Sequence, residues 1–446
     1  MASAAEQLAA NMDIGAFQKA TELHKRLLFT LGAMVVYRIG AFIPIPGIDP
    51  SAFAVVFDRQ QNGIFGMFNM FSGGAVRNMA IFALNVMPYI SASIIVQLLG
   101  TVYPPWEKLR KEGGEAGRKQ LNQYTRYLTV VLALFQAGGI AVGLQNSHGV
   151  VYEPGPMFMV TTSVILTSGT MFLMWLGEQI TSRGVGNGVS LIIFAGIVAR
   201  LPTALYQLFE QARTGNLSGF LLIVFLALAV GVVFAIVFME RAQRRLLVQY
   251  PKRQVGNRMF GGDTSFLPLK INVSGVIPPI FASSLLLLPT TVMGFMNQST
   301  LPGWAQTLEG QMRHGQPLFM VLYGALILFF SFFYTSVVFN PDETAENLRK
   351  YGGFLPGIRP GKRTAEYIDY VLTRLTVIGA GYIAVICLLP EALMANGSVS
   401  NYYFGGTSIL IVVSVTMDTV SQIQSHLLAH QYEGLIKKSK LRGGKR

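Results

Sequence analysis

The stretch "GMFNMFSGGAVRNMAIFALNVMPYISASIIVQLL", residues 66–99, decides the fold. From about Met79 onward it is an apolar run long enough to cross a bilayer, because a spanning helix needs about 20 residues. The residues before Gly73 and Gly74 are as apolar, but they are too few to span. They are nevertheless apolar enough to be buried, so the question is what a short apolar segment does beside a spanning helix.

The composition of the whole chain is that of an integral membrane protein. Of its 446 residues, 51% are hydrophobic and only 13% are charged, whereas soluble domains carry about 25% charged residues. Ten apolar runs are candidates for spanning helices. They lie near residues 25–43, 79–100, 124–144, 157–178, 188–209, 217–239, 272–297, 317–339, 371–395 and 405–428.

The basic residues divide between the loops as they do in multi-pass membrane proteins. With ten spans, both termini and every second loop lie on one side, and 27 of the 35 Lys and Arg residues fall there. Five fall in the opposite loops. Because basic residues accumulate in cytoplasmic loops, we expect both termini to be cytoplasmic. The net charge of +13, concentrated in these loops, suits anionic lipid headgroups or an acidic or phosphate-bearing partner.

The ten runs divide into two blocks of five, and an odd number per block inverts the second block in the membrane relative to the first. A short internal sequence similarity supports the division: "PYISAS" at 88–93 in the second run resembles "PPIFAS" at 278–283 in the seventh. Both runs also carry Pro and small hydroxyl residues, which allow close or shifting helix contacts. The expected units are a tail at 1–24, halves at 25–210 and 211–428, long cytoplasmic loops at 240–271 and 340–370, and a basic tail at 429–446.

Several function classes lack the residues they need. There is no G-x-x-x-x-G-K-[ST] motif, so a partner would have to hydrolyse any nucleoside triphosphate. Ionisable residues such as Glu178, Glu240 and Asp418 fall near cytoplasmic ends, which disfavours a secondary transporter, the main alternative. An intramembrane protease or lipid-modifying enzyme would need a catalytic dyad within the spans, and none can be assembled. The single Cys387 offers neither a disulfide nor a Cys-based metal site, and we expect no cofactor.

Long stretches of the chain, from about Lys25 to the last ten residues, closely resemble the bacterial SecY family. Besides residues 67–99 they are "GTMFLMWLGEQITSRGVGNGVSLIIFAGIVA" (169–199), "LPLKINVSGVIPPIFASS" (267–284), "FNPDETAENLRKYGGFLPGIRPG" (339–361) and "YFGGTSILIVVSVTMD" (403–418). The resemblance implies a protein-conducting channel that catalyses no reaction. Its expected fold is an all-α integral membrane protein with ten transmembrane helices, in two inverted five-helix halves around a central hourglass pore.

The resemblance also gives the short apolar segment a role, because SecY-like channels carry a short plug helix before helix 2. The plug is expected at about 64–74, with Gly-Gly allowing the backbone to reverse. A plug held only by Met and Phe contacts has no ion pair to break, so we expect it to move aside easily. The residues implied are Ile64, Phe65, Met67, Phe68, Met70, Phe71, Gly73 and Gly74.

The pore ring of the family is an apolar constriction, which can block ions by dewetting and still deform around a passing chain. The ring residues implied here are Val86, Ile90, Val189, Ile193, Ile280 and Ile411.

The resemblance also implies a lateral gate between helices 2 and 7, where neutral polar groups make weak, exchangeable contacts. The gate residues implied are Ser91, Ser93, Gln97, Ser283 and Ser284.

The two long cytoplasmic loops are expected to bind partners. In the second, "PGIRPG" (356–361) places Arg359 between two Pro-Gly pairs, which fix a tight turn. The residues implied are Arg244, Arg245, Lys252, Arg253, Arg258, Arg359, Lys362 and Arg363. The resemblance implies the small subunits SecE and SecG, the motor ATPase SecA, the ribosome, signal sequences and unfolded polypeptides as partners, at the bacterial plasma membrane. No small-molecule substrate is expected.

Overall fold

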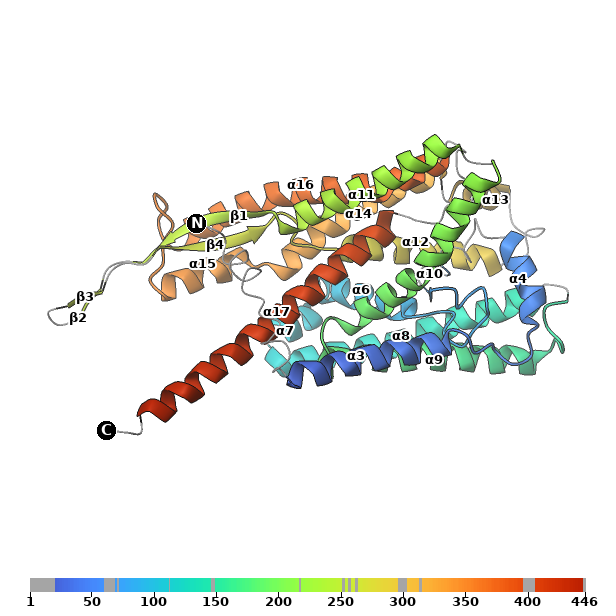
Figure 1. Ribbon diagram of the computed structural model, residues 1–446, viewed down its shortest axis with the longest axis horizontal. Helices are drawn as coiled ribbons and strands as arrows, with labels where there is room; N and C mark the ends of the chain where they lie inside the picture. Colours follow the sequence, from blue (N-terminus) through green and yellow to red (C-terminus); the bar gives the residue numbers. More distant parts are fainter. Residues whose placement is uncertain are drawn as a thin grey trace.

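In the computed structural model the chain is a bundle of long helices (Figure 1). The structure describes residues 21–59, 69, 72–111, 113–145, 149–215, 218–250, 253–255, 258–260, 264–295, 303–312, 315–395 and 406–443. Strands β1 and β4 and helix α15 project at one end of the bundle, the end at which the chain terminates, and α4 and α13 lie at the other (Figure 1).

The first half of the chain is helical in each of its five expected spans. The spanning helices are α3 (Thr21–Gly40), α6 (Met87–Val102), α8 (Gly114–Gln145), α9 (Pro156–Arg183) and α10 (Gly188–Arg213). Two short helices, α4 (Pro50–Arg59) and α7 (Pro104–Lys111), join them. Asp49 caps α4: its Oδ1 accepts hydrogen bonds from the N–H groups of Ser51 (2.9 Å) and Ala52 (3.3 Å) and from the Ser51 hydroxyl (2.6 Å). These bonds lower the pKa of the Asp49 carboxyl.

The second half is likewise helical in its five expected spans. The spanning helices are α11 (Gly219–Arg241), α12 (Ile277–Phe295), α14 (Pro317–Val338), α16 (Lys362–Ala395) and α17 (Gly406–Gly443). The shorter helices are α13 (Gly303–Gln311) and α15 (Pro341–Lys350). Helix α17 continues 15 residues past the predicted end of its span at 428, into the sequence expected to form the basic tail.

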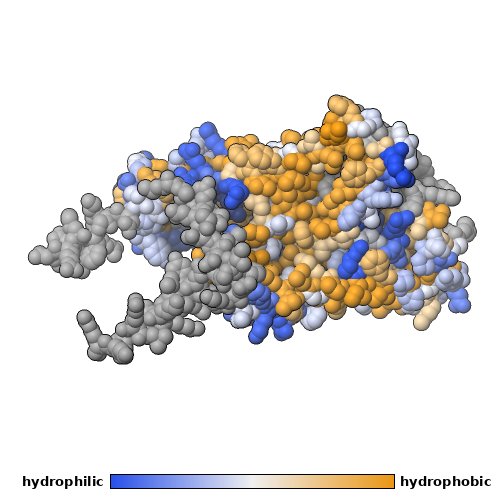
Figure 2. Space-filling model, viewed as in Figure 1, coloured by the Kyte–Doolittle hydropathy of each residue, from blue (hydrophilic) through white to orange (hydrophobic). Residues whose placement is uncertain are grey.

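Length and composition support a multi-pass membrane protein. Among the described residues, seven helices are long and apolar enough to cross a bilayer: α8, α9, α10, α11, α14, α16 and α17. Helices α6 and α12 contain shorter apolar stretches, and α3 carries its charges near its two ends. Figure 2 shows the result on the face in view, a broad apolar band across the middle of the molecule with hydrophilic residues toward both ends.

The second span is shorter than the sequence predicted. Helix formation was expected over 79–100, but α6 begins only at Met87, with Pro88 in its first turn. Met79 and Asn85 have positive φ angles of 41° and 50°, which an α-helix does not allow. Residues 79–81 instead run beside residues 43–45, through Ile45 N–H to Met79 O (2.9 Å) and Ile81 N–H to Ile43 O (3.0 Å).

The all-α expectation was incomplete for the first of the two long loops predicted to be cytoplasmic, because this loop contains strands. These are β1 (Gln243–Gln249), β2 (Arg253–Val255), β3 (Arg258–Phe260) and β4 (Thr264–Lys270), in the antiparallel pairs β1–β4 and β2–β3. The alternation in "QRRLLVQ" explains β1, because Leu246 and Val248 are buried while Arg245 and Leu247 are exposed.

One large apolar cluster lies inside the bundle and includes residues of α6, α10, α12, α14, α16 and α17. Helix α11 contributes little to it: of its residues, Ile236 alone is buried, although α11 is the most apolar span. The cluster therefore joins the two halves of the chain through α6, α10, α12 and α17, the helices on which the ring and gate residues were predicted.

Candidate functional site

The short apolar segment reaches α6 through a tight bend. Gly73 and Gly74 have φ angles of +64° and +95°, the left-handed region in which glycine carries no steric penalty. A side chain on Gly73 would also lie 2.7 Å from the Cα of Gly196 on α10, so the two backbones touch there. The predicted plug residues Ile64, Phe65, Met67, Phe68, Met70 and Phe71 lie outside the described residues.

The predicted ring residues come from four different helices and share one environment. Val86 precedes α6 and Ile90 lies in it, Ile193 is in α10, Ile280 in α12 and Ile411 in α17, and each is at most 6% exposed. Val189 of α10 packs against the same apolar cluster. The cluster is much larger than a ring, so the six-residue constriction stays a prediction.

Helices α6 and α12, between which the gate was predicted, pack against each other. Ser91, Ser283 and Ser284 are buried. The printed hydrogen bonds of the gate residues stay within one helix: Gln97 Nε2 donates to Ser93 Oγ (3.2 Å), and Ser283 Oγ donates to Ile280 O (2.9 Å). Ser284 Oγ and Gln97 Oε1 are buried without a hydrogen-bond partner. Within the described part of the chain, the seam contains polar atoms but no side-chain hydrogen bond of theirs that crosses it.

A polar group that the sequence analysis did not single out holds the start of α12. Asn272 Nδ2 donates to Glu240 Oε1 (2.6 Å) at the end of α11, and the Tyr382 hydroxyl of α16 donates to the same oxygen (3.3 Å). Asn272 Oδ1 in turn accepts from the Ser274 hydroxyl (3.1 Å) and the Gly275 N–H (3.0 Å). A carboxylate with two donors is satisfied in a site that water reaches poorly. The group therefore ties α11 and α16 to the helix on one side of the seam.

The two long loops that were predicted to be cytoplasmic and to bind partners form one unit. Gln249 at the end of β1 and Phe354 exchange two main-chain hydrogen bonds of 2.9 Å each. Beneath this bridge, residues of both loops share a small apolar cluster: Leu246, Val248, Leu269, Leu355 and Ile368. Sequence reasoning treated the loops as separate, because a contact across about 100 residues has no local pattern.

Basic residues of this unit are exposed on β1 and at the turn before α16. Arg359, Lys362 and Arg363 are exposed, and the turn before α16 is fixed by positive φ angles at Gly357 (79°) and Gly361 (106°). The Thr364 hydroxyl donates to Arg359 O (3.0 Å), which adds to this constraint. Arg244 and Arg245 are exposed on β1, Arg253 and Arg258 begin β2 and β3, and Lys252 lies outside the described residues.

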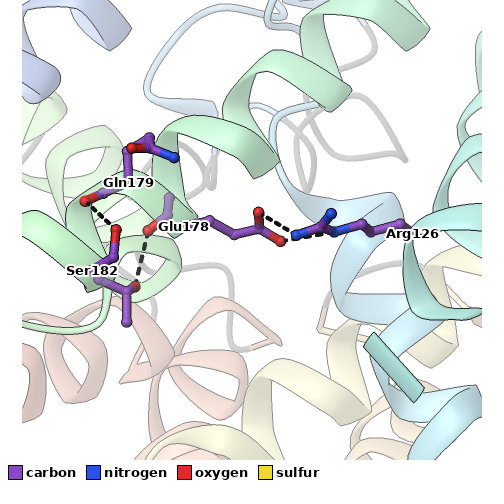
Figure 3. Close-up of polar contacts among 6 residues, drawn as sticks. Arg126, Glu178, Gln179 and Ser182 are labelled. Atoms are coloured by element: carbon purple, nitrogen blue, oxygen red, sulfur yellow. Dashed lines mark hydrogen bonds and ion pairs between the residues drawn. The ribbon is translucent and has the colours of Figure 1, made fainter. Parts of the chain in front are cut away.

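An ion pair joins α8 and α9 on the outside of the bundle. Figure 3 shows Arg126 of α8 extended toward Glu178 of α9, with Nε–Oε1 and Nη2–Oε2 distances of 3.1 and 2.7 Å. The two parallel bonds fix the orientation of both side chains. Both side chains are partly exposed, and the pair links α8 to α9. Within the described residues, no three His, Cys, Asp or Glu side chains are grouped to hold a metal ion.

Comparison with known proteins fits this architecture. The SecY family profile matches residues 80–420. The protein translocase subunit SecY of Vibrio cholerae is 55% identical over 95% of this chain and 96% of its own. That of Escherichia coli K12 is 54% identical, with the same coverage of both chains. The chain belongs to the SecY family.

Solved structures with the SecY-family fold are similar over most of the chain. "The structure of a protein conducting channel" has a TM-score of 0.65, with 17% identity and coverage of 91% of this chain and 92% of that one. Sec61 in the canine ribosome-channel complex from the endoplasmic reticulum has a TM-score of 0.61, with the same identity and coverage. At this identity the likeness shows the fold alone.

Proposed function

We propose that the chain is the pore-forming subunit of a Sec protein translocase. It passes unfolded secretory polypeptides across the bacterial plasma membrane and releases membrane segments laterally between α6 and α12. The observation that carries the proposal is the α6–α12 seam in a SecY-family chain. Its hydroxyl and amide groups are buried, yet their bonds lie within single helices, so separating the helices breaks none of these bonds.

The ring and the plug complete the channel. An apolar constriction of Val86, Ile90, Val189, Ile193, Ile280 and Ile411 would exclude ions because water leaves a narrow apolar pore. Residues 64–74 would close the outer side. Among the solved structures of similar fold is one on the plug domain of the SecY protein, which stabilises the closed state of that channel and maintains a membrane seal.

The proposed partners follow from the surface and from the family. SecE and SecG would be the small membrane subunits, and SecA or the ribosome would supply the driving force, because the chain itself carries no nucleotide-binding motif. The exposed basic residues of β1 and of the loop before α16 would bind them, and anionic lipids as well. Both termini would be cytoplasmic and the protein would catalyse no reaction.

Site-specific crosslinking tests the proposal directly. A photoreactive amino acid is placed at Ile280, and a secretory chain is arrested during export into membrane vesicles. Crosslinks to the arrested chain are expected from Ile280, and not from Val321, which is 69% exposed on α14. Equal labelling at both positions, or at neither while export proceeds, would show that the chain does not pass through this ring.

A further inference from the structure

Three side chains from two helices converge on the main chain just before α6. The Tyr37 hydroxyl donates to Ser72 O (3.1 Å), and Arg38 Nη1 donates to Gly73 O (2.8 Å), both from α3. Arg200 Nη1 of α10 donates to Asn69 O (3.3 Å). We call the three donors, with the carbonyl groups of Asn69, Ser72 and Gly73, the carbonyl clamp.

The backbone held by the carbonyl clamp is built to stay in place. Asn69 Oδ1 accepts from the Arg77 N–H and Ser72 Oγ from the Val76 N–H, both at 3.3 Å, and both side chains are at most 2% exposed. Tyr37 is fully buried, and its ring stacks on that of Phe82 at 6.3 Å. The segment is therefore fixed from both sides by hydrogen bonds and by close packing.

The Arg38 side chain does not simply extend toward the membrane surface, because its guanidinium binds a main-chain carbonyl. Arg38 lies in the last turn of α3. In the structure its guanidinium donates to Gly73 O and lies 4.7 Å from the Phe42 ring centroid. Charged donors make stronger hydrogen bonds than neutral ones, and more so where water is scarce. The clamp thus adds directed polar contacts to the apolar packing expected for the plug.

The carbonyl clamp is also placed to act on the pore. On α10, Ile193, Gly196 and Arg200 are spaced i, i+3 and i+7, so they share one helix face. Seven residues of helix separate Ile193 from Arg200 by about 10 Å along the axis. The face that carries a predicted ring residue therefore also carries the backbone contact to Gly73 and the bond to Asn69.

We propose that Tyr37, Arg38 and Arg200 are positioning residues that hold the C-terminal end of the plug segment in the closed channel. This rests on the proposed function. Closure then depends on three hydrogen bonds to the main-chain carbonyls of Asn69, Ser72 and Gly73, and displacement of the plug by a passing chain breaks them. Loss of one charged donor shifts the closed–open equilibrium about tenfold or more toward the open state.

The test uses membrane vesicles that carry the full-length chain with its partner subunits, at matched channel levels. Ion flux is measured without substrate, and export is measured for a precursor with an intact signal sequence and for one with a defective signal sequence. Arg38→Gln and Arg200→Gln are expected to raise ion flux several-fold and to increase export of the defective precursor. Export of the intact precursor is expected to continue. Arg38→Lys and Arg200→Lys, which keep a charged donor, are expected to restore much of the seal.

Matched control variants distinguish an effect on channel closure from an effect on folding. Arg213→Gln is the control on α10, because Arg213 is exposed and pairs only locally with Glu210 in the described residues. Tyr37→Phe removes one hydroxyl without a change of packing and is expected to raise ion flux, whereas Tyr206→Phe on exposed α10 surface is not. If the arginine variants do not accumulate in the membrane, the ion flux of Tyr37→Phe, compared with that of wild type and Tyr206→Phe, tests the inference.

The outcomes also separate this inference from the proposed function. If wild-type vesicles export no precursor, the proposed function fails. If they export normally and the ion flux of Arg38→Gln, Arg200→Gln and Tyr37→Phe equals that of wild type, the carbonyl clamp does not position the plug. Reduced export with unchanged ion flux would also overturn the inference, because it would place these residues in the transport path.

Discussion

The carboxamide oxygen of Gln422 on α17 accepts a hydrogen bond of 2.8 Å from the main-chain N–H of Gly186. Gly186 lies in the turn between α9 and α10, at a φ angle of +92°, so the bond joins the second half of the chain to the first. The neighbouring Val185 N–H donates to Thr30 Oγ1 of α3 (3.1 Å). One turn thus sets the relative positions of α3, α10 and α17.

Removal of this link should loosen the two halves. Gln422→Leu leaves the Gly186 N–H without its partner, and a lost partner of this kind costs about 1–3 kcal/mol. We expect a lower midpoint of thermal unfolding for the detergent-solubilised protein, and higher ion flux in vesicles because α10 and α17 carry predicted ring residues. Ser425→Ala on the same helix is the control, because the Ser425 hydroxyl donates within the helix to Ser421 O. Equal midpoints for wild type and Gln422→Leu would show that the bond contributes nothing.

A crosslink between α6 and α12 across the seam should block export. Ser91 and Ser284 are both buried on helices that pack together, so cysteines at both positions are expected to form a disulfide on oxidation and to block export. A longer flexible crosslinker should block less, and reduction should restore export. Normal export by the fully oxidised double variant would place the gate elsewhere.

Deletion of the apolar segment should raise leak without abolishing export. Removal of residues 64–71 takes away the proposed plug and also Asn69, one acceptor of the carbonyl clamp. Conductance of the variant should exceed that of Arg200→Gln, in which the segment itself remains. Unchanged conductance together with lost export would mean that the segment is a scaffold for the fold.

The basic loop before α16 should matter for the motor. Arg359 is exposed on a turn fixed by Gly357 and Gly361, and truncation of one paired charge at an interface costs about 2–5 kcal/mol. Arg359→Glu is expected to leave the channel folded and closed while ATPase-driven export falls at least tenfold. Lys362→Glu, nearer the helix, should have a much smaller effect. Equal export by Arg359→Glu and wild type would remove this residue from the partner surface.

The Arg126–Glu178 pair should contribute little to stability. Its side chains are 48% and 35% exposed, and exposed ion pairs contribute about 0–1 kcal/mol. Arg126→Gln is expected to shift the unfolding midpoint by no more than a degree or two, in a salt-dependent way. A large, salt-independent loss of stability would show that the pair is shielded from water in the membrane.

The spanning helices could be predicted because an apolar run of about 20 residues is a strong local signal. The start of α6 could not be predicted, because Met79 and Ile81 make main-chain hydrogen bonds to Ile45 and Ile43, far back in the chain, and do not continue the helix. Strand β1 shows alternation over only seven residues, which a helix-rich context hides.

The polar contacts of the site had no sequence pattern at all. Arg38 and Gly73 are 35 residues apart, and Gly186 and Gln422 are 236 apart, so no periodicity relates them. The ring and gate residues could be named only because a resemblance supplied their roles. Residue types alone would have assigned each of them to ordinary apolar or small-residue packing.

The shortness of α6 has a consequence for the lipid beside it. Sixteen residues of helix extend roughly 24 Å, less than the ~30 Å of a typical hydrocarbon core. A bilayer meets a short helix by becoming thinner around it, at a modest cost per ångström. Under the proposed lateral release, a polypeptide segment that leaves the interior beside α6 would enter a locally thinner membrane, and fewer apolar residues would be enough for it to remain there.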